Sequence, residues 1–420
     1  MRRSFLVCCL LVVLGSAGGP AIALEGELSL REAIAHARSF SPTLKAGKLL
    51  IAQTEASQRG AEAERWPRLL LSSALSQTGK DTGVAFAQGA WDTKLSLNQR
   101  LFDAFLAQDA QQQTALARRR AEAEFEAADL ALQYEVARTY FDVLRAQALE
   151  AASRVDIQQA KAQLEVAKMR LKGGVSTELD VLQVQALVAS AEDRRLQAQA
   201  TLDAAQLAFA TLLGQSGTSI HPDAKAVLLP LEMPPASASS ALTQRPELRA
   251  LDVGRQLQEL VVRQRSRAKL PTLEAAGNLG ASPYGGASYG VTGTLSWTLL
   301  DSGRIGAQVQ QAEQDAARAA AILDAGRLSA TLDIQRAQAA LHAFQGRTQL
   351  TQQQLAAANR ALQLARMRFE RGVGTNLEMI QALTALNQAQ SAAIAAKFDG
   401  FAAQLKLAQA LALPVEALSP

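Results

Sequence analysis

The chain is built from two copies of one sequence pattern. Residues 167–183 contain the turn Gly-Gly-Val-Ser-Thr and recur 198 positions later as residues 365–381, which contain Gly-Val-Gly-Thr. Pro42 and Pro67 have counterparts in Pro246 and Pro271, and the two prolines of each copy are 25 residues apart. Internal repeats restrict the fold more strongly than any local signal. Because these landmarks keep their order along the chain, they predict a duplication of its full length.

The first 23 residues have the three parts of a secretory signal peptide. Arg2 and Arg3 form a positive region, residues 5–14 form a short apolar stretch, and Ala21-Ile22-Ala23 is a cleavage site. The apolar stretch is too short for a helix that spans a bilayer. We therefore expect residues 1–23 to be removed, and the alternative is an uncleaved N-terminal anchor.

Composition excludes several classes of function. Both cysteines, Cys8 and Cys9, lie inside the signal peptide, so the mature chain would have no disulfide and no thiol chemistry. The net charge of +4 falls to +2 without Arg2 and Arg3, which gives no reason to expect a nucleic acid as partner. The histidines are scattered without a metal-ligand spacing, and no nucleophile–base set or phosphate loop occurs. The sequence therefore predicts no enzyme, no cofactor and no metal site.

Proline and glycine divide the mature chain into two long helical repeats. We assign residues 24–214 to the first repeat, residues 215–240 to a linker rich in proline and serine, and residues 241–420 to the second repeat. Between Asp103 and Lys172 there is neither glycine nor proline, and good helix formers predominate. A helix of about seventy residues would be roughly 100 Å long, which is far longer than the diameter of a small globular domain.

Each repeat is predicted to end in an antiparallel helical hairpin. A helix runs back after each turn, over about 177–214 and 375–412, so the hairpin tips lie at about 173–177 and 371–375. Apolar residues spaced by three and four precede both turns, which places a narrow seam against neighbouring helices. The same seam would also hold a soluble helical bundle together. Helix starts are predicted at Ser29, which forms a capping box with Glu32, and at Ser41-Pro42.

Two pairs of strands are predicted between the helices, at about 67–79 and 91–101 and at about 271–281 and 289–299. Apolar and polar residues alternate along the second strand of each pair. This period of two is typical of a strand whose two faces lie in different environments. All three tryptophans, Trp66, Trp91 and Trp297, lie in or beside these strands, which suits a membrane interface. The alternative is a soluble sheet whose apolar face packs on a core.

The number of strands has a consequence for assembly. Strands of about ten residues are long enough to cross a bilayer at a tilt. Four strands cannot close a barrel, because an open edge is not tolerated in lipid and the smallest membrane barrels have about eight strands. Several chains must therefore each contribute four strands. The strand count requires an oligomer but leaves dimer and trimer open.

With these features the sequence resembles the TolC family of outer-membrane efflux proteins over nearly the whole mature chain. The resemblance rests on the duplicated helix–hairpin–helix unit and on the repeated Gly-Val-x-Thr turn, which Leu-Asp/Glu-x-Leu/Ile-Gln follows at residues 179–183 and 377–381. It implies a mainly α-helical homotrimer, in which a twelve-stranded membrane β-barrel stands on a long α-helical barrel. It also implies a protein of the outer membrane that contacts its lipid and extends into the periplasm.

The resemblance also assigns roles to two groups of residues. In the family the repeated turns lie at the periplasmic tip, where an adaptor protein docks. The matching residues are Gly174, Val175, Thr177, Gly372, Val373 and Thr375. Carboxylates just past the second turn surround the closed entrance of family members. Glu378 has this position here, Gln381 replaces a frequent second acid, and Asp180 and Gln183 are the counterparts in the first repeat.

We therefore interpret the chain as the passive exit duct of a tripartite efflux system, which docks with a periplasmic adaptor and an inner-membrane pump. The first alternative is a duct of the same fold in a type I protein secretion system, which the sequence barely distinguishes from efflux. The second alternative is a periplasmic coiled-coil adaptor. Such adaptors have one helical hairpin flanked by small soluble β-domains, so two hairpins and two amphipathic strand pairs favour the duct.

Overall fold

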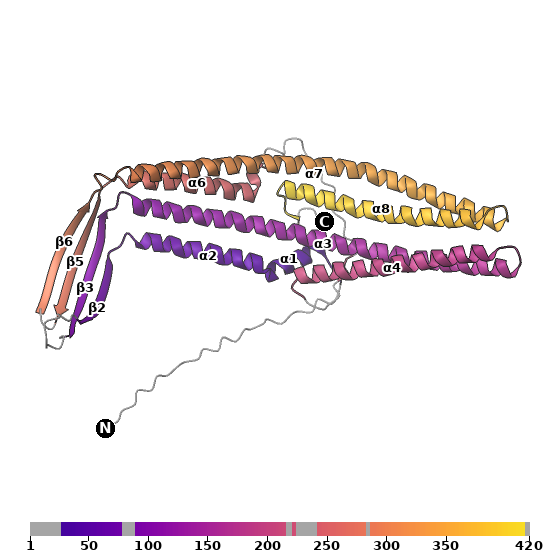
Figure 1. The fold of residues 1–420 in the computed structure, drawn as a ribbon, viewed down its shortest axis with the longest axis horizontal. Coiled ribbons are helices and arrows are strands. Elements are labelled where there is room, and N and C mark those ends of the chain that lie inside the picture. Colours follow the sequence, from indigo (N-terminus) through magenta and orange to yellow (C-terminus); the bar gives the residue numbers. More distant parts are fainter. Residues whose placement is uncertain (1–26, 78–88, 216–220, 224–241, 283–285, 416–420) are drawn as a thin grey trace, which may run out of the picture.

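The computed structural model describes residues 27–77, 89–215, 221–223, 242–282 and 286–415. The molecule is elongated, with a four-stranded sheet at one end and helices along the rest of its length (Figure 1). Two helices, α3 (Leu106–Lys172) and α7 (Arg304–Glu370), run from the sheet to the opposite end, and each has 67 residues. The predicted signal peptide, residues 1–23, lies outside the described residues.

Shorter helices lie beside the two long ones in two sets (Figure 1). Next to the sheet, α2 (Pro42–Ala63) packs against α3, and α6 (Pro246–Arg267) packs between α3 and α7. Farther from the sheet, α4 (Glu178–Leu212) runs back along α3, and α8 (Asn376–Ala410) packs against both α7 and α3. The duplicated unit is thus a short helix, two strands, a long helix and a returning helix.

Local sequence signals set the helix starts of the first repeat. The N–H of Ser29 donates to Glu32 Oε2 at 3.0 Å, and the N–H of Glu32 donates to Ser29 Oγ at 3.3 Å. This complete capping box starts α1 (Leu30–Phe40), as predicted. Ser41 then caps α2 with its hydroxyl, and Pro42 is the first helical residue, where its missing N–H costs nothing.

The largest hydrophobic core lies near the middle of the molecule, where four helices meet. Ile34 of α1, Tyr140 of α3, Phe209 of α4 and Leu405 of α8 are buried in it. Smaller apolar clusters follow along the hairpins toward their tips. The central core therefore fixes the bases of both hairpins relative to the helices that lead to the sheet.

A short parallel strand pair lies against this core and was not predicted. β1 (Glu27–Leu28) pairs with β4 (His221–Pro222), and the Tyr140 hydroxyl donates to the carbonyl oxygens of Leu28 and Asp223 at 3.0 and 3.2 Å. β4 lies within the segment 215–240, which we expected to be only a linker. Two residues are too few for a periodic signal, so the pairing could not be recognised. Most of the predicted linker lies outside the described residues.

The sheet is antiparallel throughout, with strand order β2-β3-β5-β6. β2 (Arg68–Gln77) and β3 (Gly89–Phe102) form the hairpin of the first repeat. β5 (Thr272–Ser282) and β6 (Gly286–Ser296) form the hairpin of the second. Since β3 pairs with β5, both repeats share one continuous sheet.

Strand β6 begins and ends earlier than the predicted segment 289–299. Its last ladder partner is Thr272, and the residue before Thr272 is Pro271, which has no N–H to donate. The indole Nε1 of Trp297 donates instead to the carbonyl oxygen of Lys269 at 3.1 Å. The chain therefore leaves the sheet at Trp297 and turns toward α7.

Candidate functional site

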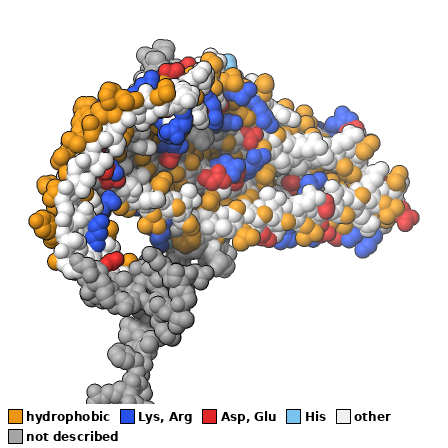
Figure 2. Space-filling view, turned by 60° about the vertical axis from the view of Figure 1, so that its left-hand side comes forward, with side chains coloured by type: hydrophobic (Ala, Val, Ile, Leu, Met, Phe, Trp, Pro, Cys, Tyr) orange, Lys and Arg blue, Asp and Glu red, His pale blue; other side chains and the backbone are white. Residues whose placement is uncertain are grey.

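The strand register gives the sheet one apolar and one polar face. Directly paired residues share a face, and successive residues of a strand alternate between faces. The apolar face carries large side chains that are exposed in the single chain, namely Leu69, Leu71, Leu75, Leu97, Leu279, Tyr289, Val291 and Leu295. Figure 2 shows hydrophobic side chains along the outer, convex side of the sheet. An apolar surface of this extent marks a contact with lipid or protein.

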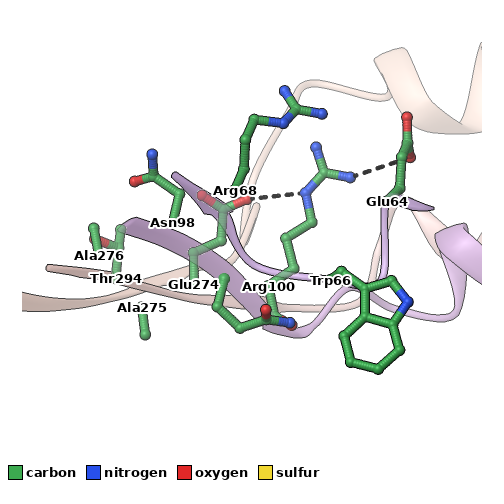
Figure 3. Close-up of a pocket in the computed structure, with 10 residues that line it drawn as sticks. Glu64, Trp66, Arg68, Asn98, Arg100, Glu274, Ala275, Ala276 and Thr294 are labelled. Atoms are coloured by element: carbon green, nitrogen blue, oxygen red, sulfur yellow. Dashed lines mark hydrogen bonds and ion pairs between the residues drawn. The ribbon is translucent and has the colours of Figure 1, made fainter. Parts of the chain in front are cut away.

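The opposite face of the sheet is polar near the helices. Arg100 lies between Glu64, at 3.8 Å, and Glu274, at 3.5 Å, and these residues border a pocket of about 220 Å³ together with Arg68 (Figure 3). The Trp66 ring points away from this group (Figure 3). Both ion pairs are about half exposed, so each contributes at most about 1 kcal/mol to stability. The face is therefore hydrated and carries charge of both signs.

Left-handed turns connect the sheet to both long helices. Asp103 and Asp301 each accept from the backbone N–H four residues ahead, at 2.7 and 2.6 Å. The turn of the first repeat contains Phe105 at a φ of 66°, and the turn of the second contains Gly303 at 88°. The backbone N–H groups of Ile305 and Gly303 hold the pKa of the Asp301 carboxyl below its usual range. No sequence motif marks these aspartates as functional residues.

A glycine in the left-handed conformation closes each hairpin tip. Gly174 has a φ of 70° and Gly372 a φ of 74°, which other residues adopt only with strain. The following residue, Val175 or Val373, donates its N–H to a carbonyl oxygen of the last helical turn at 3.1 or 3.0 Å. Both turns are therefore Schellman-type helix ends. They leave the Val175 and Val373 side chains 73% and 68% exposed at the tips.

The two threonines of the repeated turn start the returning helices. The Thr177 hydroxyl accepts from the N–H of Asp180 at 3.3 Å, and the Thr375 hydroxyl accepts from the N–H of Glu378 at 3.1 Å. Threonine is a favoured N-cap because it satisfies an N–H group that the helix leaves unpaired. Thr177 and Thr375 therefore have a structural role, whatever their part in docking.

The two carboxylates at the predicted entrance have different partners. Asp180 Oδ2 accepts from the N–H of Thr177 at 3.0 Å, from its hydroxyl at 2.8 Å and from the Ser176 hydroxyl at 3.0 Å. The hydrogen bond from the Thr177 N–H, followed by the bond from its hydroxyl, has the largest effect and lowers the pKa of the Asp180 carboxyl. Glu378 Oε2 instead lies 3.4 Å from Nε of Arg368 on α7. One turn further on, Gln183 is half-buried and Gln381 is exposed.

Contacts near the tips join the two hairpins through residues that the sequence analysis did not select. Arg170 Nη2 donates to the carbonyl oxygen of Phe369 at 2.7 Å. Asn376, which is buried at the start of α8, accepts from Gln163 at 3.3 Å and donates to the carbonyl oxygen of Asp180 at 3.2 Å. A groove of about 540 Å³ lies beside these contacts, lined among others by Val155, Gln159, Gln163, Leu362, Met379 and Leu383.

Two negative findings concern the described residues alone. No helix among them combines the length and the hydropathy that crossing a membrane requires. Within the same residues, no group of three or more His, Cys, Asp or Glu side chains is arranged to hold a metal ion.

Comparison with known families decides the identity of the chain. The family model described as "Outer membrane efflux protein" matches residues 33–215 and 238–413, which cover both repeats. The chain belongs to this family. The protein is thus an outer-membrane efflux channel, and it is not an enzyme. The predicted family, location and class of function are confirmed.

Solved structures show that this outer membrane efflux protein has the fold of known channels. CusC, studied for its folding and transmembrane channel formation, superposes with a TM-score of 0.84 at 18% identity, over 93% of this chain and 95% of CusC. The outer membrane protein VceC of Vibrio cholerae gives 0.77 at 22% identity, over 91% and 95%. The open state of the Neisseria gonorrhoeae MtrE outer membrane channel gives 0.79 at 19% identity, over 92% and 89%. No curated protein matches the sequence significantly.

The matches confirm the predicted fold class of the efflux protein. The chain is mainly helical, with a duplicated unit of long helix pairs and two β-hairpins, as in TolC-like outer-membrane channels. At identities below one quarter, the likeness to these structures concerns the fold. The roles of the tip and entrance residues therefore depend on the geometry described above.

Proposed function

We propose that three copies of this efflux protein close into one channel, whose twelve strands form a barrel in the outer membrane. The observation that carries the proposal is the sheet itself. Among the described strands, β2 and β6 each have a partner on one side only. Unpaired backbone groups at an open edge are too costly in hydrocarbon. Pairing β6 of one copy with β2 of the next gives the backbone groups of both edge strands hydrogen-bond partners. The closed barrel then turns its apolar face to lipid and its polar face to the lumen.

Exposed leucines on the helices support the same closure. α2 and α4 lie at one edge of the helical layer, and α7 lies at the other. Both edges carry exposed apolar side chains, namely Leu49 on α2, Leu196 and Leu207 on α4, and Leu328 and Leu350 on α7. Burying a leucine between copies contributes roughly 1.5–3 kcal/mol. The helical layers would thus continue the barrel as a closed tube.

The mass of the solubilised channel tests the closure. Each chain has a mass of 44.6 kDa before removal of the signal peptide. Light scattering of the detergent-solubilised protein should give the protein mass of three mature chains. The mass of a single chain would contradict the proposal, and the mass of two would contradict the number of copies.

The hairpin tips are the surface that we assign to a periplasmic adaptor, which links the channel to an inner-membrane pump. α3 and α7 both run toward the tips, and residues of α3, α7 and α8 line the groove of about 540 Å³. The side-chain oxygen of Gln159 is buried there without a hydrogen-bond partner in the described structure. A groove between helices suits a helical partner that brings apolar side chains and a hydrogen-bond donor. The channel is passive in this arrangement, and the pump supplies the energy.

A charge at the tip tests adaptor docking. Val373→Asp places a carboxylate on an exposed position that makes no contact within the helical core. It should abolish export and cross-linking to the adaptor while the trimer yield stays unchanged. Gly372→Ala is the structural control, because a side chain at a φ of 74° strains the turn itself. Loss of trimer in step with export for Val373→Asp would show that the turn matters only for folding.

Glu378 is the residue that we place at the entrance of the tube. It is half-buried in the first turn of α8, directly behind the tip. Three copies around the channel axis would bring like charges together, which attracts cations where no counter-ion offsets them. Asp180, the counterpart in the first repeat, also keeps its negative charge, because the three hydrogen bonds that its carboxylate accepts favour the ionised form. Gln183 and Gln381 line the same level without charge.

A further inference from the structure

Equivalent charges of the two repeats are connected differently at the tips. Arg368 and Glu378 are the counterparts of Arg170 and Asp180, each 198 positions later. In the first repeat, a capping box holds Asp180, while Arg170 reaches across to Phe369. In the second repeat, Nε of Arg368 lies 3.4 Å from Oε2 of Glu378. The duplication has kept both charges, but the structure joins them into a pair only in the second repeat.

The local sequence accounts for this difference. The Ser176 hydroxyl helps to hold the Asp180 carboxylate at 3.0 Å, and its counterpart is Gly374, which has no side chain to donate. Glu378 is also one methylene longer than Asp180, so its carboxylate extends beyond the N-cap toward α7. Thr375 still caps the helix through its hydroxyl at 3.1 Å, so α8 does not need the carboxylate of Glu378. That carboxylate is therefore available to Arg368.

We infer that Arg368 is the counter-ion of Glu378 and sets the ion selectivity of the channel entrance. The inference rests on the proposed place of Glu378 at that entrance. Glu378 is the one acidic residue in the first turn of α8, and Gln381 adds no charge. One Arg368 for each Glu378 leaves these six side chains without net charge. The Glu378 ring of the wild type therefore adds little to the discrimination between small cations and anions.

The exposure of the pair does not weaken this effect. The side chains of Arg368 and Glu378 are 58% and 43% exposed, so the pair adds little to the stability of the fold. Selectivity depends instead on the potential that a permeating ion meets, and a fixed charge a few ångströms from its path changes that potential directly. The counter-ion can thus control permeation while its removal leaves folding intact.

Arg371 provides a matched control on the same helix end. It carries the same charge three residues further along, and within the described structure no carboxylate lies within 4.0 Å of its guanidinium. Arg371→Gln and Arg368→Gln therefore remove equal charge from nearly the same place. Only Arg368→Gln deprives a carboxylate, that of Glu378, of its counter-ion.

Reversal potentials in planar lipid bilayers under a KCl gradient test the inference with the full-length channel. Arg368→Gln should raise the cation-to-anion permeability ratio at least about threefold and create a block by Mg²⁺ from the tip side. Glu378→Gln should lower the ratio, and the double variant should return it close to the wild-type value. Arg371→Gln should change it much less than Arg368→Gln.

The outcomes separate the inference from the proposal beneath it. Equal permeability ratios for Arg368→Gln and Arg371→Gln, combined with a lowered ratio for Glu378→Gln, would overturn the counter-ion role and keep Glu378 at the entrance. An unchanged ratio for Glu378→Gln would remove that residue from the entrance altogether. Trimer yield on gels, measured for every variant, shows that a change in current does not come from lost assembly.

Discussion

The guanidinium of Arg170 lies 3.8 Å from the ring centroid of Phe369, and the same side chain donates to the Phe369 carbonyl oxygen at 2.7 Å. Arg170 belongs to the last turns of α3, and Phe369 to the last turn of α7. One residue thus holds the tip of the first hairpin to the tip of the second by a cation–π contact and a charge-assisted hydrogen bond. The relative position of the tips depends on few contacts of this kind.

Removing this contact should loosen the tips without unfolding the channel. Arg170→Met keeps an apolar stem of similar length but loses both interactions, at a cost of about 1–2 kcal/mol. Amide hydrogen exchange should become faster in the last turns of α3 and α7, and stay unchanged in the central core. Lys172→Met is the control, because Lys172 is exposed at the end of the same helix. Equal exchange in both variants would show that the contact with Phe369 does not hold the tips.

Neighbouring residues of β6 should respond in opposite ways to a charge. Val291 is on the apolar face of the sheet and Thr292 on the polar face, both in the middle of the strand. An arginine facing lipid near mid-membrane costs about 2–4 kcal/mol, whereas a lumen position is hydrated. Val291→Arg should therefore lower the heat-dissociation temperature and yield of the assembled channel, and Thr292→Arg should leave both near wild type. The reverse order would place the polar face toward lipid.

Replacing two glycines of the second repeat by alanine should change the stability of the channel in opposite directions. Gly303 has a φ of 88° and no atom near the place of a Cβ, so Gly303→Ala costs about 1 kcal/mol through backbone strain alone. Gly346 lies inside α7, also with open space, so Gly346→Ala should stabilise by about 0.5–1 kcal/mol. Melting temperatures of the solubilised channel measure both. A lower melting temperature for Gly346→Ala would mean that this position touches another chain.

The contribution of Asp180 to stability should depend on pH. Hydrogen bonds from Thr177 lower its pKa in the folded chain, so the ionised form is favoured there. The stabilisation is therefore present above the unfolded-state pKa of about 3.9 and is lost as the pH falls through the lower folded-state pKa. Asp180→Ala should cost about 1 kcal/mol at pH 7 and progressively less below pH 4. A cost of Asp180→Ala that stays the same from pH 7 to pH 3 would contradict the capping box.

The repeated elements could be predicted because their signals are local and occur twice. The absence of glycine and proline between Asp103 and Lys172 predicts α3, and the glycines at 174 and 372 predict the turns at its end and at the end of α7. The alternation in β3 and β6 predicts one apolar and one polar face, and the strand register has both. β6 nevertheless leaves the sheet before the alternation ends, because Pro271 stops the ladder and Trp297 bonds to Lys269.

The side-chain partners at the tips could not be predicted in the same way. Gln163 bonds to Asn376 across 213 positions and Arg170 to Phe369 across 199, so no spacing within one repeat reveals these pairs. Asp180 and Glu378 have equivalent positions in the two copies. In the folded chain, the first is held in a cap and the second faces an arginine. A duplicated sequence therefore predicts duplicated backbone but not duplicated charge pairing.

The pairing of β3 with β5 has a consequence for how the ring forms. A chain of half this length would supply two strands, and six such chains would have to meet to give twelve. In this chain, every second junction between neighbouring hairpins is the β3–β5 pairing within one polypeptide. The chain tethers these two hairpins, so each meets the other at a high effective concentration. In the proposed trimer, ring formation varies with the third power of the chain concentration instead of the sixth. A sparsely expressed protein can thereby assemble at dilutions that would leave half-length chains as separate subunits.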